Sequence, residues 1–181
     1  MKAIPLIIID VQNAFLDPSW GKRNNPEAEA RIVELLEHWR AKSRPVIFIQ
    51  HDSENPKSLF YPGTETHPFM ECTKPIVGEL IINKKVNSAF IGTELETVLK
   101  QLDCSNVVIV GLTTNHCVET TTRMAGNLGF NPILVTDACA TFERKGMDGK
   151  IYPPEWIHEI TMVNLNGEFA EIMRTQDVLN L

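Results

Sequence analysis

Short apolar runs alternate with amphipathic segments along most of the chain. The runs are rich in β-branched residues and nearly continuous, and they lie at 4–11, 46–50, 80–82, 107–110 and 133–135. Apolar runs of this length are typical of strands that are buried on both faces of a parallel sheet. We therefore expect a strand at each run.

The segments between the runs carry helix signals. The first predicted helix follows Asn25 and Pro26, a capping residue and a proline suited to the first helical position. Its apolar residues recur on one helix face: Ala28, Ile32, Leu35, Leu36 and Trp39. Further helices are expected from a capping box at 93–96 through 102, from about 117 to Gly129, and from Pro153 onward, and a last strand at 169–175.

The alternation of strand and helix predicts an α/β fold. Its parallel sheet would be doubly wound, with right-handed crossovers and helices on both faces in three layers. With 181 residues and neither repeats nor linker-like stretches, the chain is expected to form a single domain over 1–181. The proline-rich segment 51–77 interrupts the alternation, and it is either a functional loop or a surface loop that covers an edge of the sheet.

The charge balance excludes some partners. Seventeen Lys and Arg residues against 23 Asp and Glu residues give a net charge of −6, which argues against nucleic acid and anionic membranes. No run approaches the roughly 20 apolar residues of a membrane span, and the apolar N-terminal stretch is too short for a signal peptide. A cytoplasmic protein is expected.

The cysteines show no pairing pattern. Their positions contain no Cys-x-x-Cys pair, which argues against a zinc ribbon and a thioredoxin-type redox motif: Cys72, Cys104, Cys117 and Cys139. We expect all of them to be reduced, since a chain of this length does not need disulfides.

Three reactive side chains follow the predicted strands. Asp10 ends the first, Lys84 ends the third, and Cys117 lies just after the fourth at a helix start. The carboxyl ends of parallel strands share one edge, so a base, a cation and a thiol are expected there together. The helix start and Lys84 would favour the thiolate, Asp10 could take its proton, and backbone N–H groups of 112–117 could hold an oxyanion. Taken singly, each residue also fits a structural role, as a turn cap, a solvated lysine or a small buried thiol.

The same residues belong to three ordered blocks. They read Asp10-x-Gln12, then Lys84-x-x-x-Ser88-Ala89-Phe90-x-Gly92-Thr93-x-Leu95, then Gly111-Leu112-Thr113-Thr114-Asn115-His116-Cys117-Val118 with Thr121. The set resembles the signature of the isochorismatase-like cysteine hydrolases, a family that includes nicotinamidases and N-carbamoylsarcosine amidases. The resemblance covers residues 2–142.

The resemblance assigns roles to these positions. It implies a catalytic triad of Asp10, Lys84 and Cys117, and a cis peptide between Leu112 and Thr113 that turns the Thr113 N–H toward an oxyanion hole shared with the N–H of Cys117. It also implies a six-stranded parallel sheet of order 3-2-1-4-5-6. Family members are commonly homodimers or homotetramers, and the segment from residue 152 onward could pack across a subunit boundary.

The sequence also departs from branches of this family. Isochorismatases proper lack the nucleophilic cysteine, so Cys117 points to hydrolysis of a C–N bond. Nicotinamidases hold a metal through an Asp-x-His pair and a further histidine, and that pattern is broken here. A site built from His51, Asp52 and His67 remains an alternative, but we predict no metal.

Residues around the nucleophile could shape the substrate site. Aromatic side chains there could wall a small pocket, and the candidates for substrate contact are Gln12, Phe15, Trp20, Phe60 and His116. Structural alternatives stand beside these roles: Phe15 could be core, Trp20 an interface residue, Gln12 a support for Asp10, and His116 a partner of the backbone.

The sequence therefore predicts a cysteine hydrolase of a small amide, carbamoyl or similar C–N bond, acting through a thioester and without a cofactor. The rivals are a ligand-binding or thiol-sensing protein on the same scaffold and a metal-assisted nicotinamidase.

Overall fold

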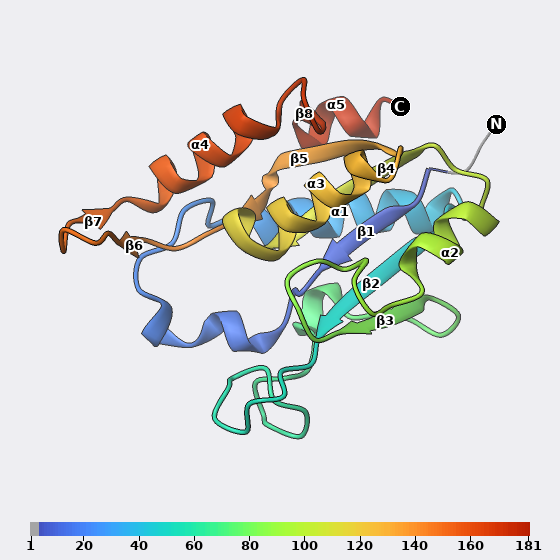
Figure 1. Cartoon of the computed structure of the whole chain (residues 1–181). Coiled ribbons are helices and arrows are strands. Elements are labelled where there is room, and N and C mark those ends of the chain that lie inside the picture. The colour runs from blue at the N-terminus through green and yellow to red at the C-terminus, as the bar shows by residue number, and fades with distance from the viewer. Residues whose placement is uncertain (1–3) are drawn as a thin grey trace.

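The central element of the computed structural model is a six-stranded sheet (Figure 1). The structure describes residues 4–181, so residues 1–3, which the single-domain prediction and the family resemblance include, lie outside it. All neighbouring strands are parallel, and the order β3-β2-β1-β4-β5-β8 confirms the prediction of 3-2-1-4-5-6. The strands are β1 (Leu6–Ile9), β2 (Val46–His51), β3 (Leu80–Lys84), β4 (Asn106–Leu112), β5 (Asn131–Ala140) and β8 (Glu171–Met173).

The apolar run of β1 is continuous because the strand is buried on both faces of the sheet, as the sequence predicted. Leu6 and Ile8 pack into the core on one face of the sheet, and Ile7 and Ile9 pack into the core on the other. All are fully buried, and each contributes about 1.5–3 kcal/mol by the usual transfer estimate. At the edge strand β3 the expectation of two-sided burial fails, since Leu80 and Ile81 are exposed.

Helices cover both faces of the sheet and complete three layers (Figure 1). The apolar faces of α1 and α5 pack on one side, and those of α2, α3 and α4 pack on the other. The predicted apolar stripe of α1 is buried, and its Trp39 donates its indole N–H to the Ile4 carbonyl at 2.8 Å. The helices are α1 (Ala28–Ala41), α2 (Leu95–Gln101), α3 (Glu119–Asn127), α4 (Pro154–Leu165) and α5 (Thr175–Leu179).

Two irregular segments build up the carboxyl side of the sheet. A hairpin of β6 (Arg144–Lys145) and β7 (Ile151–Tyr152), which the sequence pattern did not predict, follows β5. The proline-rich loop after β2 is tied to the end of β1, because Met70 donates its N–H to the Val11 carbonyl at 3.0 Å. Figure 1 shows this loop projecting beyond the strand ends.

Two predictions concern the surroundings of the chain. None of the helices in the described residues is long and apolar enough to cross a membrane. The homo-oligomer stays a prediction, and α4 is where we would look for its interface. Trp156, Ile160 and Val163 are exposed there at helical spacing.

Candidate active site

The three predicted catalytic side chains meet at the carboxyl edge of the sheet. Asp10 directly follows β1, Lys84 is the last residue of β3, and Cys117 lies in the turn after β4. The Nζ atom of Lys84 is 2.7 Å from Oδ2 of Asp10 and 3.2 Å from Sγ of Cys117. The lysine therefore lies between the carboxylate and the thiol.

Lys84 is the centre of this cluster. Its side chain is fully buried and reaches past the end of β2, where His51 is its register partner. The ammonium also donates to Nδ1 of His51 at 2.9 Å and to the Val86 carbonyl at 3.2 Å. Burial alone would lower the pKa of Lys84, but the neighbouring Asp10 and Cys117 raise it above its ordinary value. The raised pKa and the ion pair with Asp10 both favour the charged form of the lysine.

The His51 ring is neutral in this arrangement. Its burial, followed by the field of Lys84, lowers the pKa of the imidazole. Its Nδ1 then accepts a hydrogen bond from the ammonium, which places the ring proton on Nε2. His51 was expected only as a metal ligand, and its place beside Lys84 was not predicted.

The nucleophile lies on an unusual backbone segment. Residues Thr114–Val118 form a π-helical turn that leads into α3, and such turns are frequent at functional sites. The peptide bond between Leu112 and Thr113 is cis, and Thr113 is the residue that precedes the turn. Both Thr113 and Cys117 are buried.

Gly111 permits the close approach of β4 to β1 just before this turn. Its φ of +129° lies in the region that favours glycine, and a Cβ there would lie 2.2 Å from the Ile9 carbonyl oxygen. The pairing of β4 with β5 also shifts register between Ile109 and Gly111. A residue with a side chain could not hold the nucleophile turn in this place.

The resting thiol is protonated, contrary to the expectation from the sequence. Burial raises the pKa of Cys117, the Asp10 carboxylate raises it further, and Lys84 opposes both. Lys84 lowers the pKa of the thiol, as expected from the sequence, but the burial of the thiol and the Asp10 carboxylate raise it by more. The nucleophile therefore needs a base at the moment of attack.

Asp10 is placed to be that base. Its φ of +52° is a strained conformation that, among residues with a side chain, asparagine and aspartate tolerate well. Its Oδ2 pairs with Lys84, while Oδ1 is buried without a hydrogen-bond partner in the described structure. One carboxylate oxygen is thus available for a proton.

A possible cation site overlaps this cluster. Donor atoms of Asp10, His51 and Cys117 lie within 4.8 Å of one another and could hold a metal ion. The Nζ of Lys84, however, bonds to the same three side chains. Because the ammonium already fills the cation position, a metal here would have to displace Lys84. These residues therefore do not fit a metal while Lys84 keeps its charge.

The alternative metal set is arranged differently. Nε2 of His67 lies 2.7 Å from Oδ1 of Asp52, and Asn83 donates to Oδ2 of Asp52 at 2.8 Å. His51 instead turns Nδ1 toward Lys84. Asp52 therefore pairs with His67 and with the Asn83 amide, whereas His51 pairs with Lys84.

Gln12 connects the strand ends to the loop. Its amide nitrogen donates to the carbonyls of His51 and His67 at 3.3 and 2.6 Å, and its oxygen accepts the His51 N–H at 2.8 Å. The side chain is fully buried. Its polar atoms are used by the backbone, so the structure assigns it bracing and not the substrate contact expected from the sequence.

The predicted aromatic residues form one cluster beside the catalytic group. The ring of Phe15 lies 5.1 Å from Trp20 and 4.9 Å from Phe60. Phe142, which sequence reasoning missed, stacks on Trp20 at 5.3 Å. The Phe60 ring is also 5.5 Å from His51, so the cluster reaches the partner of Lys84. Phe15 is buried and belongs to the core, whereas Trp20 and Phe60 are only partly buried.

Sequence reasoning missed two further residues next to the nucleophile turn. His158 of α4 hydrogen-bonds through Nδ1 to Thr114 and through Nε2 to Thr136, both at 2.9 Å. Burial lowers the pKa of His158 to about 4, so the ring is a neutral link between α4, the turn and β5. Arg144 of β6 donates to Nδ1 of His116 at 3.3 Å. Neither residue lies in a motif or a periodic pattern, so no local signal marked it.

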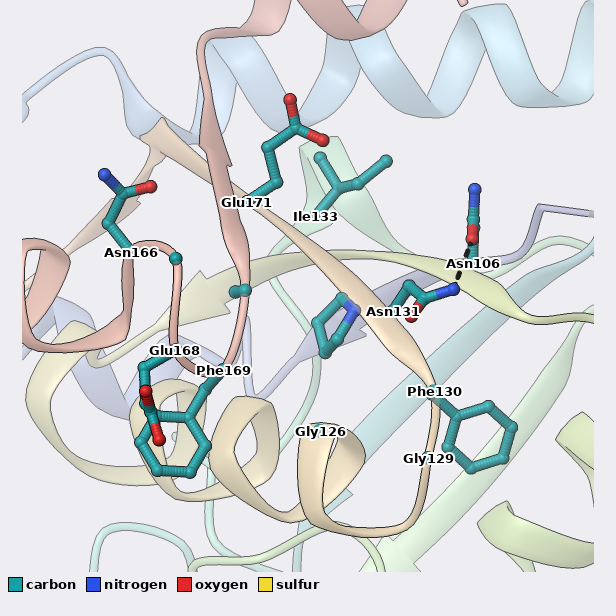
Figure 2. A pocket seen from close by; sticks show the side chains of 13 residues that line it. Asn106, Gly126, Gly129, Phe130, Asn131, Ile133, Asn166, Glu168, Phe169 and Glu171 are labelled. Carbon is teal, nitrogen blue, oxygen red and sulfur yellow. Dashed lines mark hydrogen bonds between the residues drawn. The ribbon is translucent and has the colours of Figure 1, made fainter.

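A surface cleft lies at the opposite edge of the sheet. Its volume is about 610 Å³, and Figure 2 shows it around Asn106 and Asn131, the first residues of β4 and β5. Its lining includes the carboxylates Glu168 and Glu171 but no residue of the catalytic cluster, the nucleophile turn or the aromatic cluster. We therefore place the chemistry at the carboxyl edge.

Comparisons with known proteins agree with this fold and site. The isochorismatase domain family matches residues 5–177. The uncharacterized isochorismatase family protein YrdC of Bacillus subtilis is 50% identical over 175 residues, covering 97% of this chain and 94% of that protein. Nicotinamidase 3 of Arabidopsis thaliana is 29% identical over 95% of this chain and 85% of its own. The crystal structure of an isochorismatase-family protein of Chromobacterium violaceum superimposes with a TM-score of 0.97, at 41% identity, over 99% of this chain and 93% of that one.

The chain therefore belongs to the isochorismatase family, whose members are hydrolases.

Proposed function

We propose that this isochorismatase-family hydrolase cleaves the C–N bond of a small amide or carbamoyl compound through a thioester on Cys117. The observation that carries the proposal is the buried contact of Lys84 with both Asp10 and Cys117. It puts a nucleophile, a proton acceptor and a cation within reach of one carbonyl carbon. A relative with the name nicotinamidase is consistent with amide chemistry.

The reaction begins with a proton transfer. Burial and Asp10 raise the pKa of the Cys117 thiol, so it is protonated before the reaction. Asp10 accepts this proton as the sulfur attacks the carbonyl. A C–S bond forms, and the carbonyl electrons move to the oxygen. The N–H groups of Thr113 and Cys117 are proposed to bind this oxyanion.

The intermediate then collapses to products. The C–N bond breaks, its electrons stay on nitrogen, and Asp10 returns the proton to the leaving amine or ammonia. Water loses a proton to Asp10 and attacks the thioester. The C–S bond breaks, the thiolate takes the proton back, and the acid leaves. No cofactor takes part in these steps.

The first test separates the nucleophile from the other cysteines. We expect Cys117→Ala to abolish release of ammonia or amine from a panel of amides and carbamates, with an unchanged midpoint of urea unfolding. Cys72→Ala is the matched control, since Cys72 is exposed, and it should keep full turnover. Undiminished turnover by Cys117→Ala would contradict the proposal.

A second test separates the base from the cation. Asp10→Asn removes the carboxylate that raises the pKa of Cys117, while Lys84 still lowers it, so the pKa of the thiol should fall. Iodoacetamide should then label Cys117 faster at neutral pH than in the wild type, although turnover is lost because no group carries the proton. If the variant labels more slowly, Asp10 does not hold the thiol in its protonated form.

The two rivals make different predictions. A thiol sensor would label at Cys117 but release no amine from any amide of the panel. A metal-assisted nicotinamidase would lose turnover with a chelator and regain it with a divalent ion. We favour the metal-free reading because Lys84 bonds to the same three side chains that could hold the ion.

A further inference from the structure

Arg144 differs from most other arginines of the protein in having no carboxylate partner. Arg23, Arg31, Arg40 and Arg123 each form an ion pair with a glutamate at 2.5–2.7 Å. Within residues 4–181, no acidic side chain lies within ion-pair distance of Arg144. A guanidinium that is partly withdrawn from water without an anion is costly, so it needs a functional reason.

The surroundings of Arg144 leave part of its hydrogen-bonding capacity unused. One N–H of the guanidinium donates to His116, and the Nε atom is buried without a partner. Burial lowers the pKa of the Arg144 guanidinium, which agrees with a cation without a nearby anion. It stays charged, because arginine does not deprotonate in proteins.

The place of Arg144 connects it with the chemistry. His116, which it contacts, directly precedes the nucleophile. On its other side the guanidinium lies over the Trp20 ring, 5.9 Å from the centroid, and the Trp20 ring is 6.3 Å from that of Phe60. Phe60 in turn contacts His51, the partner of Lys84. Arg144 is therefore connected to the surroundings of Cys117 in two ways: directly through His116, and through the aromatic rings that lead to Lys84.

We propose that Arg144 binds a carboxylate of the substrate, so that the bond cleaved at Cys117 belongs to a small amide acid. The planar fork of a guanidinium matches a carboxylate in shape and charge, and stacking on Trp20 holds the fork in place. The aromatic cluster packs against the part of the substrate between its two polar ends. The nature of the bond rests on the proposed function, whereas the anion site does not.

The test uses two alkylating reagents that differ in charge. Iodoacetate carries a carboxylate where iodoacetamide carries an amide, and both react with the same thiolate. The ratio of their rates at Cys117 therefore does not depend on the pKa of the thiol. We expect Arg144→Gln to lower the iodoacetate/iodoacetamide ratio by roughly tenfold or more, as expected for loss of a charge-assisted hydrogen bond. The iodoacetamide rate should stay unchanged, and Arg144→Lys should restore only part of the ratio.

Two controls belong to the same experiment. Lys145→Gln removes the same charge from the neighbouring exposed residue, and its ratio should equal that of the wild type. Cys72 is exposed and serves as the internal reference thiol, since peptide mass spectrometry reads both cysteines in one sample. An unchanged ratio in Arg144→Gln overturns the proposal. An equal loss with both reagents also overturns it, because that result indicates a merely structural role through His116.

Binding without turnover gives a second measurement. In a Cys117→Ala background, succinamate should raise the thermal unfolding midpoint more than butyramide, which has a methyl group in place of the carboxylate. This difference between the two ligands should vanish when Arg144→Gln is added. A difference of the same size with and without Arg144→Gln would overturn the proposal. Since neither measurement needs catalysis, an inactive amide panel combined with an Arg144-dependent ratio would contradict the proposed function alone.

Discussion

The buried ion pair of Asp10 and Lys84 allows a sharp prediction about stability. Lys84→Met keeps an unbranched side chain only one atom shorter and removes the ammonium, which leaves the Asp10 carboxylate buried without its cation. Breaking a buried pair from one side costs about 3–5 kcal/mol of unfolding free energy. We expect Lys84→Met to be destabilised by that amount.

The magnitude follows from two opposing terms. With the charged atoms 2.7 Å apart, Coulomb's law at an effective dielectric constant of about 20 gives roughly 6 kcal/mol of attraction. Removing each ion from water costs several kcal/mol, so the intact pair contributes little in total. The double variant Asp10→Asn/Lys84→Met, which removes both charges, should therefore be much closer to the wild type than either single variant. Asparagine suits the positive φ at position 10.

The assay is urea unfolding followed by tryptophan fluorescence, since Trp39 is fully buried in the core. The slope against urea must stay constant across the variants for the free energies to be comparable.

Lys85→Met is the matched control. Lys85 pairs with Glu54 at the same distance of 2.7 Å, but both side chains are largely exposed. Its loss should leave the unfolding free energy unchanged within error. The reasoning is refuted if Lys84→Met is as stable as Lys85→Met, or if the double variant loses the sum of the two single losses.

Two further predictions concern the nucleophile turn. Gly111→Ala should abolish turnover and lower the thermal unfolding midpoint strongly, because its Cβ would lie 2.2 Å from the Ile9 carbonyl oxygen. Gly167→Ala, at a positive φ but with nothing within 4 Å, should show only the conformational cost of about 1–2 kcal/mol, and equal losses would contradict the steric argument. His158 has a pKa of about 4 in the folded protein against 6.5 ordinarily, so its contribution to stability is complete above 6.5 and is lost as the pH falls toward 4. Urea unfolding between about pH 7.5 and 4.5 should therefore show a fall of about 2–3 kcal/mol that His158→Gln lacks, and parallel profiles of the two proteins would exclude this role.

Much of the scaffold could be predicted because its signals are local. The apolar run before Asp10 and the glycine before Leu112 each carry a pattern that holds within a few residues. Since parallel strands share their carboxyl edge, the order of the strands then brings Lys84 to Asp10 although 74 positions separate them in the sequence.

The rest depends on tertiary packing and leaves no such pattern. Arg144 and Phe142 reach the site because the segment after β5 runs alongside the loop that follows β1. An arginine in a polar segment looks the same whether or not it meets a carboxylate. The pKa of Cys117 likewise depends on how deeply the thiol is buried, which neither spacing nor composition gives.

The burial of the site and its protonated thiol are consistent with each other. Before attack the cluster holds an anion on Asp10, a cation on Lys84 and a neutral thiol, so its net charge is zero. After the proton moves, Asp10 is neutral and the anion is on the sulfur, so the net charge is still zero. Lys84 contacts both groups, at 2.7 and 3.2 Å, and can stabilise the anion on either side of the transfer without moving. Creating a new, unpaired charge in this buried site would cost the full desolvation free energy of the ion. Moving one negative charge across a fixed ammonium avoids that cost, which is why the thiol can be buried and still react.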